Sequence, residues 1–291
     1  MLQNFQINSE EIDKIKKITS EEKNFRIKNL KFFQNSGFPN KRQEDWKFSD
    51  FQNIVNNNFD ELKVENITSN IHKIKTLEDF DHNFIFLING NLHSSNFDYE
   101  ENNKIKIKKY KCNTDYLPSK NPLICLNHAL ADGGYSLEIE ENYKFKKVLV
   151  IYNFFTNNIK NKILNNKNEI KLKKNSELHI IEYTINESKD KFINNTYENI
   201  ILEEKSKLRN MYLQNGKSNG FFYRFLKNNL SFNSDNVSFI FSSGLNFNKM
   251  DLEFNLLDEK CSCKILSALF LNNSEHNEIK TRINHLAPNC N

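Results

Sequence analysis

Cys261 and Cys263 are the two residues whose type and spacing most directly suggest chemistry in this sequence. Residues two positions apart on a β-strand point to the same side, so both thiols would share one face and could begin a metal or iron–sulfur site. Such sites usually need four ligands. Ile265 would share that face, which favours an inward position where cysteine packs as a small hydrophobic residue. The sequence therefore predicts two buried, metal-free thiols, and a transient metal or sulfur site is the alternative.

The last sixteen residues hold a second group of polar and reactive side chains. Within them, Thr281, Ile283 and His285 alternate with Lys280 and Arg282, which predicts that the two sets occupy opposite faces of a strand. His285 would then be either a hydrogen-bonded histidine in a stacked sheet or a ligand or interface residue. The side chains that stand out in this stretch are His276, Thr281, His285, Pro288 and Cys290.

The composition excludes several classes of protein. The 291 residues are enough for about two domains. The 41 basic and 37 acidic residues give a net charge of +4, so we expect a mixed, solvated surface and no nucleic-acid partner. No apolar run approaches the ~18 residues that span a bilayer, and no signal peptide is evident near Met1. The five scattered cysteines form no disulfide framework, so the expected location is the reducing cytoplasm. We also expect neither a serine nucleophile nor a phosphate-binding loop, and therefore no enzyme and no ATP site.

The first third of the sequence shows helix start and stop signals. Ser9 and Ser20 are the expected N-caps of two helices, the second with acidic residues in its first turn. Gly37, followed by Pro39, is expected to end the second helix. Asn89–Gly90 follows an apolar run and predicts a tight turn.

Asparagine is unusually abundant, with 50 residues against 7 glycines. After glycine, Asn best tolerates left-handed backbone angles, so adjacent asparagines are expected to serve in turns. The pairs expected there are Asn157–Asn158, Asn165–Asn166 and Asn228–Asn229.

From about Tyr135, short segments alternate apolar and polar residues with the period of a β-strand. Segments that begin near Ser176, Ser206 and Asn236 recur at steps of about 30 residues, as stacked turns of a solenoid do, although periodicity alone would also allow a β-sandwich. The alternation predicts one buried apolar face per segment. The side chains expected inside are Val237, Phe239, Phe241, Leu252 and Phe254.

Three stretches together resemble the SufB/SufD family, subunits of the machinery that builds iron–sulfur clusters. The C-terminal stretch, with its Thr-x-Ile-x-His and Pro-x-Cys pattern, resembles a motif of that family. Residues 37–48, which include Arg42, Glu44 and Trp46, resemble its N-terminal segment and are more typical of the SufD branch. Residues 126–139 resemble the entry into the family's β-helix. The three matches keep the family's order, so the chain is similar to a SufD-type protein.

The resemblance implies a mainly β fold, in which a right-handed parallel β-helix follows a smaller mixed α/β domain. The implied boundaries are residues 1–133 for the N-terminal domain and 134–291 for the β-helix. In the family the C-terminal motif is followed by a further stretch that includes the tail that docks the ATPase. The resemblance therefore implies a β-helix that is truncated, with an uncovered last turn, a tendency to self-associate and no binding to a SufC-type ATPase.

The resemblance also implies a function. With the further stretch present, the protein would be a non-catalytic scaffold of the SufBCD complex that pairs with a SufB-like subunit and a SufC-like ATPase. No cofactor would be bound stably, although a transient contact with iron or an iron–sulfur cluster would occur in the complex. Two alternatives stay open: a SufB-type scaffold that carries the nascent cluster, and a β-helix enzyme that acts on carbohydrate through carboxylates in a cleft. Trp46 is expected either to anchor a local core or to contact a partner.

Overall fold

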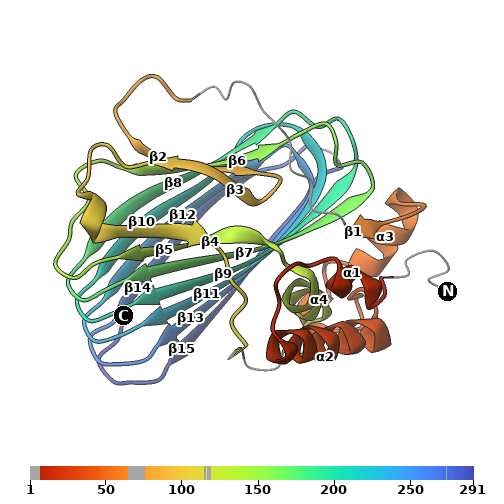
Figure 1. Ribbon diagram of the computed structural model, residues 1–291, viewed down its shortest axis with the longest axis horizontal. Coiled ribbons are helices and arrows are strands. Elements are labelled where there is room, and N and C mark those ends of the chain that lie inside the picture. The colour runs from red at the N-terminus through yellow and green to blue at the C-terminus, as the bar shows by residue number, and fades with distance from the viewer. Residues whose placement is uncertain (1–6, 65–75, 115, 117–118, 273) are drawn as a thin grey trace.

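The computed structural model describes residues 7–64, 76–114, 116, 119–272 and 274–291 (Figure 1). Met1 and the other residues on which the expectation about a signal peptide depends lie outside these ranges. The described chain is mainly β, with a solenoid of about five turns over residues 133–285 that follows a mixed α/β region. The predicted fold class is therefore confirmed.

The solenoid consists of two stacks of parallel strands, and the chain alternates between them. Every neighbouring pair within each stack is parallel, which excludes the antiparallel sandwich. One stack holds β5 (Gly133–Ile139), β7 (Lys162–Leu172), β9 (Phe192–Leu202), β11 (Ser218–Leu230), β13 (Leu245–Leu256) and β15 (His276–His285). The other holds β6 (Leu149–Phe155), β8 (Glu177–Asn186), β10 (Lys207–Gln214), β12 (Asp235–Ser243) and β14 (Ser262–Phe270).

The region before the solenoid contributes helices and further strands. Most of the helices gather at one end of the molecule, beside the odd-numbered stack (Figure 1). Strand β2 extends the even-numbered stack by pairing parallel with β6, and β4 pairs antiparallel with β5. The elements are α1 (Glu10–Asp13), α2 (Ser20–Ser36), the 3-10 helix η1 (Glu44–Trp46), α3 (Phe51–Asn58), β1 (Lys63–Val64), β2 (Asn83–Ile88), β3 (Asn91–Asn96), η2 (Asn102–Lys104), β4 (Ile105–Lys109) and α4 (Pro122–Leu130).

The helix boundaries follow the predicted signals only in part. Thr19, rather than Ser20, caps α2, because its hydroxyl accepts the backbone N–H of Glu22 at 3.1 Å. Ser9 precedes α1 as predicted, but its side chain makes no cap bond. Gly37 ends α2 with a φ of 68°, a left-handed angle that glycine adopts without strain.

The predicted turn at Asn89–Gly90 joins β2 to β3, with positive φ at both residues, as a tight antiparallel connection of this kind requires. Of the asparagine pairs, only Asn157–Asn158 lies in a turn. Asn165–Asn166 and Asn228–Asn229 lie within β7 and β11, so these two predictions are wrong. Their amides instead bond across turns of the solenoid: Asn195 Nδ2 donates to Asn165 Oδ1 at 2.7 Å. Left-handed Asn residues stand elsewhere, at Asn89, Asn142, Asn161, Asn175, Asn233 and Asn289.

The repeat length is shorter than predicted after the first step. Leu178 pairs with Leu208, a step of 30, but Leu208 pairs with Asn236, a step of 28. The equivalent of Ser206 in the next turn is therefore Ser234 and not Asn236. The difference in repeat length falls in the corners between strands, so the strands still pair in parallel.

The prediction of inward-facing residues is right for β13 and wrong for β12. Leu252 and Phe254 are buried in the core of the solenoid, as predicted. Val237, Phe239 and Phe241 instead lie half-buried on the outer face, while Asn236, Ser238 and Ile240 point inward. Ser238 Oγ donates to Asn210 Oδ1 at 2.6 Å, which satisfies polar side chains inside the solenoid. Alternation fixes two faces of a strand, but it does not say which face is inside.

Strands β14 and β15 are the outermost strands of the described sheet, and each pairs on one side only. Apolar side chains are correspondingly exposed there: Phe270 is 63% exposed, and Leu266 and Ile283 are also exposed. No described strand pairs with the outer edges of β14 and β15. Among the described residues, no helix is both long and apolar enough to cross a membrane.

Candidate functional site

The structure brings together two sequence motifs that lie more than 220 residues apart. Residues 45–49 contact the outer face of β15, where Ser49 Oγ lies 2.8 Å from His276 Nε2 and also bonds to the carboxylate of Glu278. Lys280 pairs with Asp45 on the same face. The junction between the N-terminal motif and the C-terminal motif is therefore the candidate site.

An apolar column on the outer face of the odd-numbered stack forms the floor of this junction. Strand register places Ile163, Ile193, Phe221 and Phe247 in line, and all four are buried. His276 continues the column one strand further, with its ring parallel to that of Phe247 at a centroid distance of 5.2 Å. The residues that cover the column from the N-terminal region include Phe38, Trp46, Phe51 and Phe59.

Lys249 is the charged centre of the junction. Its side chain is fully buried, and its Nζ lies 2.6 Å from Glu278 and 3.2 Å from Asp251. The same Nζ lies 5.0 Å from the centre of the Trp46 ring, so the indole face adds a cation–π contact. Two carboxylates and an aromatic face thus compensate the cost of burying this ammonium group.

Asp251 completes the network two residues further along β13. It accepts the hydroxyl of Tyr223 at 2.8 Å, and Tyr223 in turn accepts the amide of Asn121 at the same distance. Burial raises the pKa of Asp251, and Lys249 and Tyr223 act against that rise. The network therefore ties the loop before α4 to the solenoid.

Ser49, His276 and Glu278 contain the side chains of a hydrolase triad but not its arrangement. In a triad the carboxylate orients the histidine and the histidine alone contacts the serine. Here Glu278 bonds to Ser49 directly, and its nearest approach to His276 Nε2 is 3.8 Å. Ser49 is also 1% exposed, which leaves no access for a substrate. Burial lowers the pKa of His276, against the nearby Glu278. The three groups form a structural hydrogen-bond relay.

A groove of about 690 Å³ opens beside this network, between the N-terminal segment and the outer faces of β11, β13 and β15. Its walls carry charges of both signs around an apolar patch, as surfaces that bind proteins often do. The lining residues are Gln43, Glu44, Asp45, Trp46, Ser119, Lys120, Asn121, Ile124, Phe225, Asp251, Leu252, Glu253, Lys280 and Arg282.

The other motif residues lie outside the network. Arg42 and Glu44 are exposed on the N-terminal segment, and Pro288 is exposed after β15. Register pairs Thr281 with Leu252 and His285 with Leu256, so both continue inward-facing columns, as the alternation predicts. Both are exposed because β15 has no further neighbour among the described strands.

The cysteines lie at a corner of the solenoid rather than in the junction. Cys261 is fully buried, as predicted, whereas Cys263 is only partly buried and packs at the edge of the core. His285 is the last residue of β15. Among the described residues, no three His, Cys, Asp or Glu side chains are grouped so that they could hold a metal ion.

Residues 216–220 do fit the Gly-x-Ser-x-Gly pattern of a serine nucleophile, contrary to the expectation that the sequence has none. A nucleophile of this kind stands on a sharp turn from a strand to a helix. Ser218 instead begins strand β11, is buried, and accepts the backbone N–H of Gly220 at 3.0 Å. The pattern here belongs to a solenoid corner.

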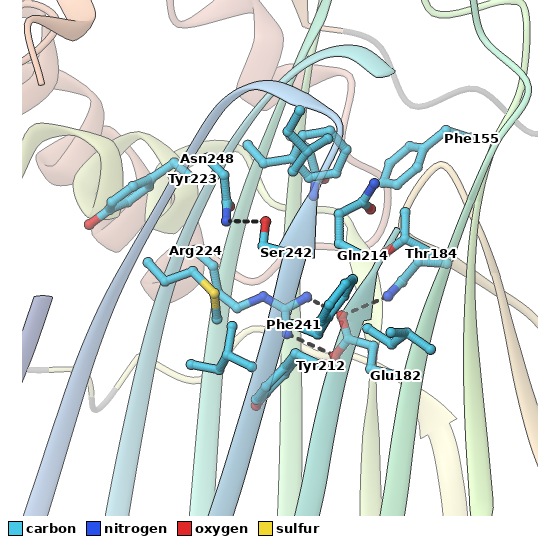
Figure 2. A pocket seen from close by; sticks show the side chains of 17 residues that line it. Phe155, Glu182, Thr184, Tyr212, Gln214, Tyr223, Arg224, Phe241, Ser242 and Asn248 are labelled. Carbon is cyan, nitrogen blue, oxygen red and sulfur yellow. Dashed lines mark hydrogen bonds and ion pairs between the residues drawn. The ribbon is translucent and has the colours of Figure 1, made fainter. Parts of the chain in front are cut away.

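A buried ion cluster inside the solenoid has no counterpart in the sequence motifs. Arg224 on β11 bonds to Glu182 on β8 (Figure 2). It also bonds to Glu198 on β9 at 2.9 Å. Asn153 Nδ2 also donates to Glu182 at 2.7 Å, and the Tyr212 ring lies 4.7 Å from the guanidinium. A small cavity of about 50 Å³ adjoins the cluster. Three separate strands supply the charges, so only the folded structure could reveal them.

Lys167 is a further buried charge that no sequence pattern predicts. Its ammonium group has no hydrogen-bond partner and lies among aromatic rings, the nearest being Tyr116 at 4.4 Å and Tyr197 at 5.5 Å. Phe25 of α2 and Tyr110 complete the surroundings. Burial lowers the pKa of Lys167 to about 7.

Lys167 makes the stability of the protein depend on pH. Its folded pKa lies below the value of about 10.4 in an unfolded chain, so between these values the unfolded state binds more protons. The free energy of unfolding should therefore rise with pH from about 7.5 to 9.5, by up to about 1.4 kcal/mol per pH unit from this group. We expect Lys167→Met to remove that slope in urea titrations, and Lys109→Met, at an exposed position, to keep it. Equal slopes in all three proteins would contradict this prediction.

Comparison with known proteins gives a match to the C-terminal part of the chain. Residues 154–291 match the family model described as SUF system FeS cluster assembly, SufBD core domain. No curated protein matches the chain. The matched residues begin near the end of β6 and include every later strand of the solenoid as well as the C-terminal half of the junction. Residues 154–291 are therefore similar to the SufBD core domain of the SUF system for iron–sulfur cluster assembly.

Proposed function

We propose that this protein is a SufD-type, non-catalytic scaffold of a SUF complex, which pairs with a SufB-like subunit and a SufC-like ATPase during iron–sulfur cluster assembly. The observation that carries the proposal is the SufBD core match over residues 154–291, which falls on a parallel β-solenoid. The N-terminal segment with Arg42, Glu44 and Trp46 favours the SufD branch. That segment is joined to the core through Ser49 and Asp45.

The proposed scaffold binds no cofactor stably and works in the cytoplasm. Iron or a nascent cluster would be cargo that contacts the complex transiently, and Cys261, Cys263 and His285 remain the side chains of suitable chemistry near the outermost turn. Of these, Cys263 and His285 are accessible without rearrangement, since Cys261 is fully buried.

A carbohydrate-active enzyme has less support than a scaffold. Such enzymes place two free carboxylates on either side of a substrate cleft. In this solenoid Glu182 and Glu198 are both buried and both bound to Arg224. Their charges are therefore used for packing inside the protein.

The proposal predicts a specific complex with a SufB-like subunit. We expect the tagged chain to capture that subunit from a co-expressing cell, because the exposed apolar residues of β14 and β15 offer an unpaired sheet edge. Phe270→Asp should reduce the capture about tenfold, since it buries a charge in such an interface. Phe48→Asp is the matched control, because Phe48 is 74% exposed on the N-terminal segment.

Failure of the wild-type chain to capture any SufB-like subunit would contradict the proposed pairing. Anaerobic incubation with iron and sulfide distinguishes the two branches of the family. A SufD-type chain should retain no stoichiometric cluster after desalting, whereas a retained cluster would identify a SufB-type scaffold.

A further inference from the structure

One corner of the solenoid repeats the same backbone geometry in every turn. In each turn, a residue with positive φ comes directly before a corner residue. The residue after the corner residue donates its backbone N–H to the carbonyl of the corner residue in the preceding turn. Ser262 thus donates to the carbonyl of Ser234 at 3.0 Å, and Asn291 to that of Cys261 at 2.9 Å. The residues that follow the positive φ are Tyr143, Ser176, Ser206, Ser234, Cys261 and Cys290.

Serine side chains hold this corner in three successive turns. The hydroxyls of Ser176, Ser206 and Ser234 each donate to the carbonyl three residues earlier, at 2.7 Å in every case. Cys261 Sγ makes the same bond, to the carbonyl of Asp258 at 2.9 Å. The thiol has therefore replaced a hydroxyl at a position where serine also fits.

Cys290 occupies the next place in the column, and its sulfur reaches the same carbonyl of Asp258, at 3.2 Å. Two atoms that each lie about 3 Å from one oxygen are at most about 6 Å apart. Burial raises the pKa of Cys261, and the nearby Cys290 is among the groups that raise it further. Adjacent strands lie about 4.8 Å apart, within the Cα separation of about 4.4–6.8 Å that a disulfide needs.

The two thiols differ in accessibility. Cys261 is fully buried, whereas Cys290 is partly exposed. Cys263 also lies near the pair, but Asn291 bonds to the backbone of both Cys261 and Cys263, each at 2.9 Å. This pattern places Asn291 beside Ser262 and Cys290 beside Cys261. Cys261 is therefore the natural partner of Cys290.

We propose that Cys261 and Cys290 are a redox-active pair, in which an oxidising low-molecular-weight disulfide joins them and staples the outermost turn of the solenoid to the turn before it. The Cys290 thiolate attacks the reagent disulfide, forms a mixed disulfide and releases one thiolate. The Cys261 thiolate then attacks the Cys290 sulfur and releases the second. Two protein thiols lose two electrons and two protons, and one reagent disulfide becomes two thiols.

The staple forms where β14 and β15 leave a sheet edge open. It would tie the segment after β15 to the corner between β13 and β14 without changing the strands themselves. Oxidation thus acts on the part of the protein that offers an unpaired edge to other chains.

The test is treatment of the reduced, intact chain with glutathione disulfide, followed by mass spectrometry and thiol counting. We expect a loss of about 2 Da and a decrease from five free thiols to three, with a peptide that links Cys261 to Cys290. Cys261→Ser should stop the reaction at a glutathione adduct on Cys290. That variant should fold, because serine holds the same corner in three other turns.

Cys263→Ser and Cys125→Ser are the matched controls, and both should still form the linkage. A linkage that maps to Cys263, a persistent glutathione adduct in the wild-type chain, or five unreacted thiols would each overturn the proposal. Dithiothreitol should restore all the thiols, which distinguishes the disulfide from irreversible oxidation.

Discussion

Replacing Arg224 with methionine should destabilise the protein by about 3–5 kcal/mol at pH 8, because two buried carboxylates lose their shared counter-charge. Glu182 and Glu198 are 5% and 2% exposed, so water cannot replace the guanidinium. Burial raises the pKa of Glu198, and Arg224 is the main influence that opposes the rise. The measurement is the free energy of unfolding from urea titrations followed by circular dichroism.

The dependence on pH gives this prediction a second readout. Without Arg224, the buried carboxylate of Glu198 should take up a proton more readily in the folded state than in the unfolded chain. The loss of stability in Arg224→Met should therefore be smaller at pH 5.5 than at pH 8. The matched control combines Arg224→Met with Glu182→Gln and Glu198→Gln, which removes all three charges and should recover much of the lost stability. A loss below about 1 kcal/mol in the single variant would show that the cluster is hydrated.

Replacing Trp46 with alanine should cost about 3–5 kcal/mol, the usual range for removing a large aromatic side chain from a core. Trp46 is 1% exposed and lies against Phe51 and Tyr223, at ring distances of 5.8 and 5.2 Å. The substitution also removes the aromatic face over the buried ammonium group of Lys249. Urea unfolding followed by circular dichroism measures the effect.

The consequence of Trp46→Ala should be local as well as global. Because Trp46 fixes the N-terminal segment to the solenoid, we expect faster tryptic cleavage after Lys41, Arg42 and Lys47 in the folded protein. Phe48→Ala is the control in the same segment, since Phe48 is 74% exposed and should change stability by less than about 0.5 kcal/mol. Similar losses in both variants would mean that the segment is not anchored through the tryptophan.

These two predictions concern different parts of one architecture. The Arg224 cluster links three strands inside the solenoid, whereas Trp46 joins the N-terminal region to its outer face. Trp46 contacts Lys249, which pairs with Glu278 of β15, so a variant at Trp46 could also disturb the outermost strand of that stack. Stability therefore has to be measured alongside every capture experiment.

Several features of the protein follow from the sequence alone because they depend on neighbouring residues. The end of α2 at Gly37 and the tight turn at Asn89–Gly90 follow from the backbone angles that these residues tolerate. The alternation after Tyr135 predicts strands, and the repeat of about 30 residues predicts that they stack. Cys261 is buried, as predicted, although it lies at a corner and not within a strand.

The tertiary structure alone decides which face of each strand is inside and which distant residues meet. Val237, Phe239 and Phe241 lie outside because Asn and Ser side chains can bond to their equivalents in adjacent turns, a partner that no local pattern contains. Ser49 meets His276 only because register carries β15 past the N-terminal segment. Propensity and alternation are local properties, whereas register, burial and ion pairing depend on contacts between turns, and these contacts form the candidate site.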